Sequence, residues 1–167
     1  MVRATQRQAT IHATAVLVGA RAILIRGPAG SGKSRLALRL LQAAETGLVG
    51  FARLVGDDRV HADAAHGHVL VRPAAALAGL IEIRGAGLWR LPYEPLAAVG
   101  WVVDLADPDA SRLPEPSAMT TVLLDIRLPR LAVARDADPT MPVLAFLGRI
   151  AGCPAVAASG SLGQRPV

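Results

Sequence analysis

The most specific chemical pattern in the sequence is a glycine-rich segment, GPAGSGKS, at positions 27–34. Its spacing fits G-x-x-x-x-G-K-[ST], in which glycines let backbone N–H groups approach a phosphate, the lysine reaches the outer phosphate oxygens, and the hydroxyl binds Mg²⁺. Lys33 is also the only lysine among the chain's 18 Lys and Arg residues. The pattern predicts a site for a nucleoside di- or triphosphate. The residues expected to form it are Gly27, Pro28, Ala29, Gly30, Ser31, Gly32, Lys33, Ser34 and Arg35.

The segments on either side of this loop are those that the motif requires. Residues 22–25 form an apolar run that predicts a buried strand, and the apolar spacing from Ser34 to about Ala44 predicts a helix that stops at Gly47. A helix in this position directs its N-terminal N–H groups toward the phosphates. Because strand, loop and helix follow in this order, we interpret the motif as a phosphate-binding loop rather than a chance match.

Composition limits the classes of protein that fit. With 167 residues, 52% of them hydrophobic and 3% aromatic, the chain predicts one domain with an aliphatic core, spanning residues 1–157, and a disordered tail at 158–167. The net charge of +5 is spread along the chain without a long basic run, which argues against nucleic acid as a partner. A single cysteine, Cys153, excludes an internal disulfide and a Cys-based zinc site. The absence of a signal peptide or an 18-residue apolar stretch predicts a soluble cytoplasmic protein without membrane contact.

The rest of the pattern indicates many short strands and few helices. Residues 1–10 are polar and are expected to fray, while a turn at 19–21 joins the first two strands into a hairpin. A second hairpin turns at residues 65–67, and Pro129 is expected to split two late strands. A helix at 143–150 is expected to close the domain. The other predicted strands are 13–18, 52–55, 60–63, 68–71, 80–84, 99–105, 122–128 and 131–133.

Phosphoryl transfer needs a carboxylate beside the phosphate loop, and two positions compete for that role. Asp57 and Asp58 follow the short strand at 52–55, and Asp104 follows the longer apolar run at 99–103. By pattern alone Asp104 is the better match to an apolar strand that ends in an aspartate. Turn or strand-end roles remain open for all three carboxylates.

Four ordered segments resemble HPr kinase/phosphorylase. They are His12, the loop at 27–34, LVGDDRV at 54–60 and GLIEIRGAG at 79–87, and together they cover about half of the chain. Members of that family phosphorylate a serine of the phosphocarrier protein HPr and often reverse the reaction. The resemblance, which is to the short form found in α-proteobacteria, implies a P-loop kinase domain of the HPr kinase / phosphoenolpyruvate carboxykinase-like type, an α/β fold rich in strands with few helices. It also implies ATP and Mg²⁺ as cofactors and HPr or a nitrogen-system homologue as partner. It further implies a role in a phosphotransferase system and a homo-oligomer, such as a hexamer.

The resemblance also implies a role for individual residues. Asp57 matches the general base, with His12 placed beside it and Lys33 on the phosphates. Longer members of the family carry a glycine-containing arginine loop for phosphorolysis, which here corresponds to residues 125–131. Because Pro129 stiffens that segment and the glycine is missing, the sequence predicts kinase activity that exceeds phosphorolysis. The expected metal ligands are Ser34, Glu82 and Asp58, and the possible anion contacts are Arg84, Arg127 and Arg130.

Two other functions fit the loop. A small-molecule P-loop kinase would keep the same phosphate site but would need an enclosed acceptor pocket and usually a mobile lid, and no long lid segment is evident. A nucleotide-binding regulatory module would keep Lys33 and Ser34 but tolerate the loss of Asp57. Incubation with γ-labelled ATP separates the three, because the label enters HPr, a metabolite or nothing.

Lys33→Ala should abolish phosphoryl transfer and weaken nucleotide binding. The ammonium stabilises charge on the transferring phosphate, and the loss of one such group costs on the order of a hundredfold or more in rate. Transfer from γ-labelled ATP and titration with a fluorescent nucleotide measure the two effects. Unchanged transfer by the variant would remove the phosphate-loop interpretation.

Overall fold

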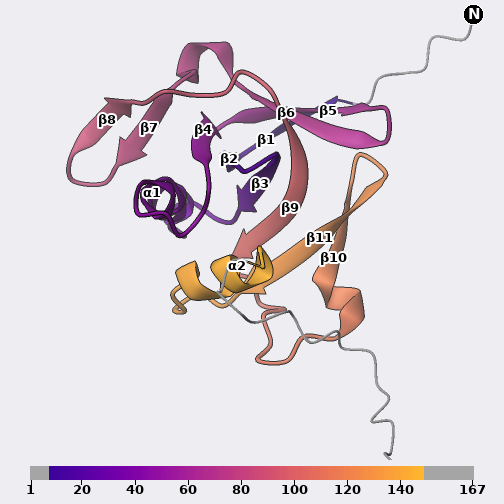
Figure 1. Ribbon diagram of the computed structural model, residues 1–167. Coiled ribbons are helices and arrows are strands. Elements are labelled where there is room, and N and C mark those ends of the chain that lie inside the picture. Colours follow the sequence, from indigo (N-terminus) through magenta and orange to yellow (C-terminus); the bar gives the residue numbers. More distant parts are fainter. Residues whose placement is uncertain (1–7, 149–167) are drawn as a thin grey trace, which may run out of the picture.

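The computed structural model describes residues 8–148 as a mixed β-sheet with a small hairpin and two helices (Figure 1). The larger sheet has nine strands, seven of them in the order β1-β5-β6-β9-β3-β2-β4, and β11 joins it through β9 and carries β10. β7 and β8 form a separate two-stranded sheet. The elements are β1 (Gln8–Ile11), β2 (Ala13–Val18), β3 (Arg21–Arg26), α1 (Lys33–Glu45), β4 (Ala52–Gly56), β5 (Val60–Ala65), β6 (His68–Pro73), β7 (Leu80–Ile83), β8 (Gly87–Arg90), β9 (Ala97–Leu105), β10 (Thr120–Leu123), β11 (Ile126–Val133) and α2 (Thr140–Phe146).

The longest strand, β9, joins the two parts of the sheet. Its first residues pair with β6 in antiparallel fashion, while its later residues lie between β3 and β11 and run parallel to both. Figure 1 shows β9 passing between the strands near the N-terminus and the orange β10–β11 hairpin. The carboxyl ends of β3, β9 and β11 therefore meet at one edge, directly before the phosphate loop.

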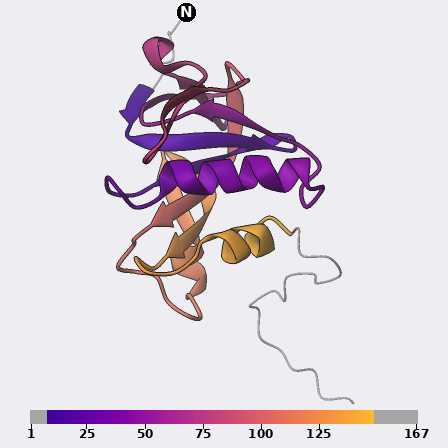
Figure 2. The same ribbon diagram turned by 90° about the vertical axis from the view of Figure 1, so that its left-hand side faces the viewer.

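Two apolar clusters fill the two sides of the sheet, because neighbouring side chains of a strand point to opposite faces. In β3, Ile23 and Ile25 belong to one cluster, while Ala22 and Leu24 belong to the other. The first cluster is covered by α1, which packs against β2 and β4 (Figure 2). The helix buries one stripe at helical spacing, made of Leu36, Ala37, Leu40 and Ala43.

Most of the predicted strands are present with boundaries shifted by one or two residues, and the prediction of a strand-rich fold with few helices is correct for the described residues. Residues 13–18 form β2 as expected, and the helix expected from Ser34 runs from Lys33 to Glu45. Two elements were missed. β1 lies partly in the segment expected to fray, and its register with β5 pairs Thr10 with His61. β8 completes a hairpin with β7.

The prediction for the late strands was wrong. Residues 122–128 do not form one strand, because the chain reverses at Leu124 and Asp125, which both have positive φ (51° and 63°). A two-residue hairpin of this kind usually carries Asn or Asp followed by Gly, and here Asp125 follows Leu124 and no glycine is present, so the turn signal is weak. Pro129 does not split a strand either. It forms the last residue pair of β11 with β10, just before β11 begins to pair with β9. Its missing N–H therefore lies at the end of one hydrogen-bond ladder and outside the other.

The predicted C-terminal helix is present in part. α2 spans Thr140–Phe146, earlier than the expected 143–150. Ile150, Cys153 and the tail at 158–167 lie outside the described residues.

Asp104, the second carboxylate candidate, forms the centre of an ion-pair network at the end of β9. Arg26 on β3 donates to both of its oxygens at 2.6 and 2.7 Å, and Nε of Arg130 on β11 donates at 2.6 Å. Arg130 also pairs with Asp107. Burial alone would raise the pKa of Asp104, but the hydrogen bonds and charges of the two guanidinium groups outweigh it and hold the pKa below its usual value. Asp104 thus links the ends of three strands.

Asp104→Asn should lower the free energy of unfolding by about 3 kcal/mol, because it leaves two partly buried guanidinium groups without their shared carboxylate. The lowered pKa makes this stabilisation complete above the unfolded-state pKa, about 4, and lost as pH falls through the folded-state value. Denaturant unfolding at neutral and acid pH should therefore show a smaller acid-induced loss in the variant than in the wild type. Asp109→Asn, at an exposed site in the loop that follows β9, is the control. Equal unfolding midpoints for Asp104→Asn and the wild type would contradict the assignment.

Candidate active site

The loop between β3 and α1 has a backbone that depends on glycine. Gly27, Gly30 and Gly32 all have positive φ (148°, 77° and 94°). A Cβ on Gly27 would lie 2.7 Å from Ser31 Oγ and 2.8 Å from the Leu105 carbonyl oxygen, so a side chain does not fit there. Substitution would therefore distort the curve that brings the loop's N–H groups together.

The loop and the start of α1 offer polar groups that lack partners among residues 8–148. No side chain caps the N-terminus of α1, so its first N–H groups are available to an anion. The buried Ser31 Oγ has no hydrogen-bond partner among the described residues. A bound phosphate chain fits this loop. Its oxygens would accept hydrogen bonds from the uncapped N–H groups and from the unpaired hydroxyl, and the close-packed glycines would let it approach the backbone.

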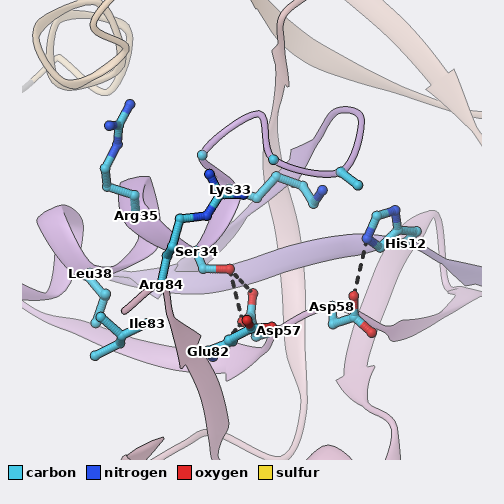
Figure 3. Close-up of a pocket in the computed structure, with 13 residues that line it drawn as sticks. His12, Lys33, Ser34, Arg35, Leu38, Asp57, Asp58, Glu82, Ile83 and Arg84 are labelled. Carbon is cyan, nitrogen blue, oxygen red and sulfur yellow. Dashed lines mark hydrogen bonds and ion pairs between the residues drawn. The ribbon is translucent and has the colours of Figure 1, made fainter. Parts of the chain in front are cut away.

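A cavity of about 410 Å³ lies beside this loop (Figure 3). It brings together residues that lie far apart in the sequence, from His12 to Arg84. The hairpin β7–β8 contributes one wall, and the loop with the first turns of α1 contributes the other. The residues that line it are His12, Ala29, Gly30, Gly32, Lys33, Ser34, Arg35, Leu38, Asp57, Asp58, Glu82, Ile83 and Arg84.

Asp57 is the buried carboxylate of this cavity, with only 4% of its surface exposed. Ser34 Oγ donates to both of its oxygens at 2.9 and 3.0 Å, and the backbone N–H of Glu82 donates at 3.2 Å (Figure 3). A further donor, Thr14 on β2, lies 2.6 Å from Oδ1. Thr14 was not among the site residues predicted from the sequence, although it is the single hydroxyl in the apolar run at 13–18.

Lys33 is buried and folds back over its own loop. Its Nζ donates to the carbonyl oxygens of Gly27 at 2.9 Å and Pro28 at 3.1 Å. Burial lowers the pKa of Lys33 from its usual value, and the negative charges of Asp57 and Asp58 oppose that shift. The ammonium thus lies between the loop carbonyls and the negative charges of two carboxylates.

Asp58 points away from Asp57 and toward His12. Its Oδ1 lies 3.2 Å from His12 Nε2, and both side chains are more than half exposed (Figure 3). Asp58 has a φ of 64°, a turn conformation that separates the two adjacent carboxylates. The structure therefore places His12 and Asp58 together at the rim and Asp57 in the interior.

The three predicted anion contacts do not lie together. Arg84 lines the cavity, and its Nη2 would be 3.6 Å from a Cβ on Gly30, so its guanidinium lies against the phosphate loop. Arg127 and Arg130 are not among the lining residues, and Arg130 is held by Asp104 and Asp107. A second cation that the prediction grouped with the loop, Arg35, lies similarly close to Gly32.

Among residues 8–148 no three acidic, histidine or cysteine side chains are arranged to hold a metal ion by themselves. Mg²⁺ bound with a nucleotide does not need such a set, because phosphate oxygens and water supply most of its ligands. Ser34 and Glu82, which both line the cavity, fit the smaller contribution expected of the protein. Asp58 lies on the His12 side of the same cavity.

The fold and cavity define a strand-rich P-loop domain, and a search of solved structures agrees. The chain is similar to the structure of the Hpr(Ser) kinase/phosphatase from Coxiella burnetii, with a TM-score of 0.67, 22% sequence identity, and coverage of 84% of this chain and 94% of that one. This similarity shows that the two proteins share a fold, as the sequence predicted. No protein-family model and no curated protein matches the chain. Neither helix within residues 8–148 has the length and apolar character needed to span a membrane.

Gly27→Ala should distort the loop and weaken nucleotide binding by about tenfold or more, because the new Cβ meets Ser31 and the Leu105 backbone. Isothermal titration with ATP and Mg²⁺ measures the effect. Gly50→Ala is the matched control, since its added Cβ would meet nothing within 4 Å and its φ is not positive. Equal affinity of the two variants would mean that the loop's shape does not matter for the ligand.

Proposed function

We propose that this protein is an ATP- and Mg²⁺-dependent protein serine kinase that phosphorylates HPr or a homologous phosphocarrier protein. The observation that carries the proposal is the buried Asp57 carboxylate, hydrogen-bonded to Ser34 of the phosphate loop in a cavity that also contains Lys33. The shared fold with an Hpr(Ser) kinase/phosphatase supports the choice of acceptor.

The loop and its neighbours would bind the cofactors. N–H groups of residues 27–35 and the Lys33 ammonium would hold the phosphates, while Ser34 and Glu82, with Asp58 nearby, would hold Mg²⁺. Bound ATP with Mg²⁺ would supply the phosphoryl group that is transferred. Arg84, whose guanidinium lies against Gly30, would add positive charge beside the phosphates.

Asp57 would accept the proton of the acceptor's serine hydroxyl. Ser34 shows that a hydroxyl on the cavity side can donate to both carboxylate oxygens at ordinary hydrogen-bond distances. An acceptor serine that takes this place would have its proton directed at Asp57 and its oxygen toward the loop. His12, paired with Asp58 at the rim, would lie next to the entering acceptor.

The same arrangement favours phosphorylation of the acceptor protein over phosphorolysis, the reverse reaction. Phosphorolysis brings inorganic phosphate to a phosphorylated protein, so two anions must meet and extra positive charge is required. Arg130, which the sequence offered for that purpose, already pairs with Asp104 and Asp107, and Arg127 does not line the cavity.

The wider setting of the proposal rests on the resemblance of the four sequence segments. It comprises a cytoplasmic location, a regulatory role in a phosphotransferase system, and assembly into an oligomer such as a hexamer, without nucleic acid or membrane partners. Sedimentation of the purified protein measures the oligomeric state directly.

The deciding experiment is incubation with γ-labelled ATP, Mg²⁺ and the HPr-like protein of the same organism. Label on a serine of that protein supports the proposal, and omission of Mg²⁺ should abolish it. Label that appears only in a metabolite from a cell extract would identify a small-molecule kinase. Nucleotide binding without transfer to either would identify a regulatory module.

Asp57→Asn should keep nucleotide affinity but lower the transfer rate by at least about a hundredfold, the usual contribution of a positioned general base. The amide cannot accept the serine proton, and residue 57 is not part of the loop at 27–35 that would hold the phosphates. Initial rates with labelled ATP, together with ATP titration, separate the two effects. Asp136→Asn, at an exposed position outside the cavity, is the control. Transfer at the wild-type rate by Asp57→Asn would eliminate Asp57 as the proton acceptor.

A further inference from the structure

Thr14 is a buried hydroxyl in an otherwise apolar part of β2. Its surface is fully buried, as are those of its neighbours Ala13, Ala15 and Val16. A hydroxyl at such a place costs free energy unless it forms a hydrogen bond, and a valine of the same shape would avoid that cost. Thr14 Oγ1 donates to Asp57 Oδ1 at 2.6 Å. The hydroxyl therefore has a defined partner in the carboxylate that we assign as the proton acceptor.

An irregularity between β2 and β4 aligns these two residues. Ala15 pairs with Gly56, but the next residue, Val16, pairs with Leu54, so β4 contains one extra residue at Val55. Without this bulge the register from Val16 would place Gly56, not Asp57, opposite Thr14. With the bulge, Asp57 follows Gly56 into the position opposite Thr14. Bulges commonly redirect a side chain beside an active site, and this one directs the carboxylate onto the hydroxyl.

The hydrogen-bond donors to Asp57 differ in which carboxylate oxygen they bind and from which side they approach it. Ser34 donates to both oxygens from the cavity side, the place that the acceptor hydroxyl would take. Thr14 donates only to Oδ1, from the buried strand, and the Glu82 N–H donates only to Oδ2, from β7. With one fixed donor on each oxygen, the plane of the carboxylate stays set when Ser34 no longer donates to it.

We propose that Thr14 is a positioning residue, which orients the Asp57 carboxylate for proton transfer without touching the substrate. This inference rests on the proposed role of Asp57. Threonine suits the task because its branched Cβ restricts χ1, so the hydroxyl keeps its direction. Serine would retain the hydroxyl with more rotational freedom, whereas valine would retain the shape and lose the donor.

The test compares Thr14→Val, Thr14→Ser and Thr10→Val in steady-state transfer from ATP to the HPr-like protein. Thr14→Val should lower kcat by on the order of ten- to a hundredfold, as expected for a misdirected reacting group, with the KM for ATP unchanged. Thr14→Ser should recover most of the lost rate. Thr10→Val, a threonine replaced on β1 away from the cavity, should match the wild type.

The same substitutions in the Asp57→Asn background separate positioning from general structural support. If Thr14 acts through the Asp57 carboxylate, Thr14→Val should cause no further loss of rate in that background. An equal loss in both backgrounds, or wild-type kcat for Thr14→Val, would overturn the inference while leaving the kinase intact. If Thr14→Val does not bind ATP because it fails to fold, Thr14→Ala and Thr14→Ser decide the same comparison. A wild-type protein that transfers no label to the acceptor would overturn the proposed function itself.

Discussion

The arrangement of the site depends on one buried carboxylate. A charged group removed from water is costly unless hydrogen bonds replace its hydration, and Asp57 receives them from β2, from the first turn of α1 and from the backbone of β7. These elements are far apart in the sequence, so the carboxylate fixes the phosphate loop and the β7–β8 hairpin to the sheet at one point. Because hydroxyl and amide donors carry no formal charge, they stabilise the carboxylate without cancelling its charge.

Asp104 is the contrasting case, because it also follows an apolar strand but meets different partners. Arg26 and Arg130 neutralise its charge and use both of its oxygens, and its pKa is lowered by them. A carboxylate in that state is a poor proton acceptor, because guanidinium groups hold both of its oxygens. The network instead holds the ends of β3, β9 and β11 together immediately before Gly27. One aspartate thus stabilises the strands that carry the phosphate loop, and the other performs the chemistry that we propose.

Local features of the sequence were enough to predict the phosphate loop, α1 and most strands, because glycine spacing and apolar periodicity act over a few residues. The choice between Asp57 and Asp104 was not local, since both follow apolar runs and only their tertiary partners distinguish them. The role of Thr14 was hidden for the same reason, because it depends on a bulge at Val55 in another strand. The turn at Leu124 and Asp125 uses left-handed backbone at a leucine and without a glycine, so the β10–β11 hairpin was not predicted.

Charge in the cavity bears on the direction of the reaction. Lys33, Arg35 and Arg84 line it together with Asp57, Asp58 and Glu82, so acidic and basic side chains balance when His12 is neutral. In phosphorolysis no ATP is bound, so Lys33, Arg35 and Arg84 would have to face inorganic phosphate and the phosphorylated serine together. Arg130 could add a further cation only by leaving Asp104 and Asp107. That move would leave Asp107 without this partner and Asp104 with Arg26 alone, which raises the cost of bringing two anions together. An acceptor serine is neutral and carries no such cost, which supports a kinase whose reverse reaction is weak.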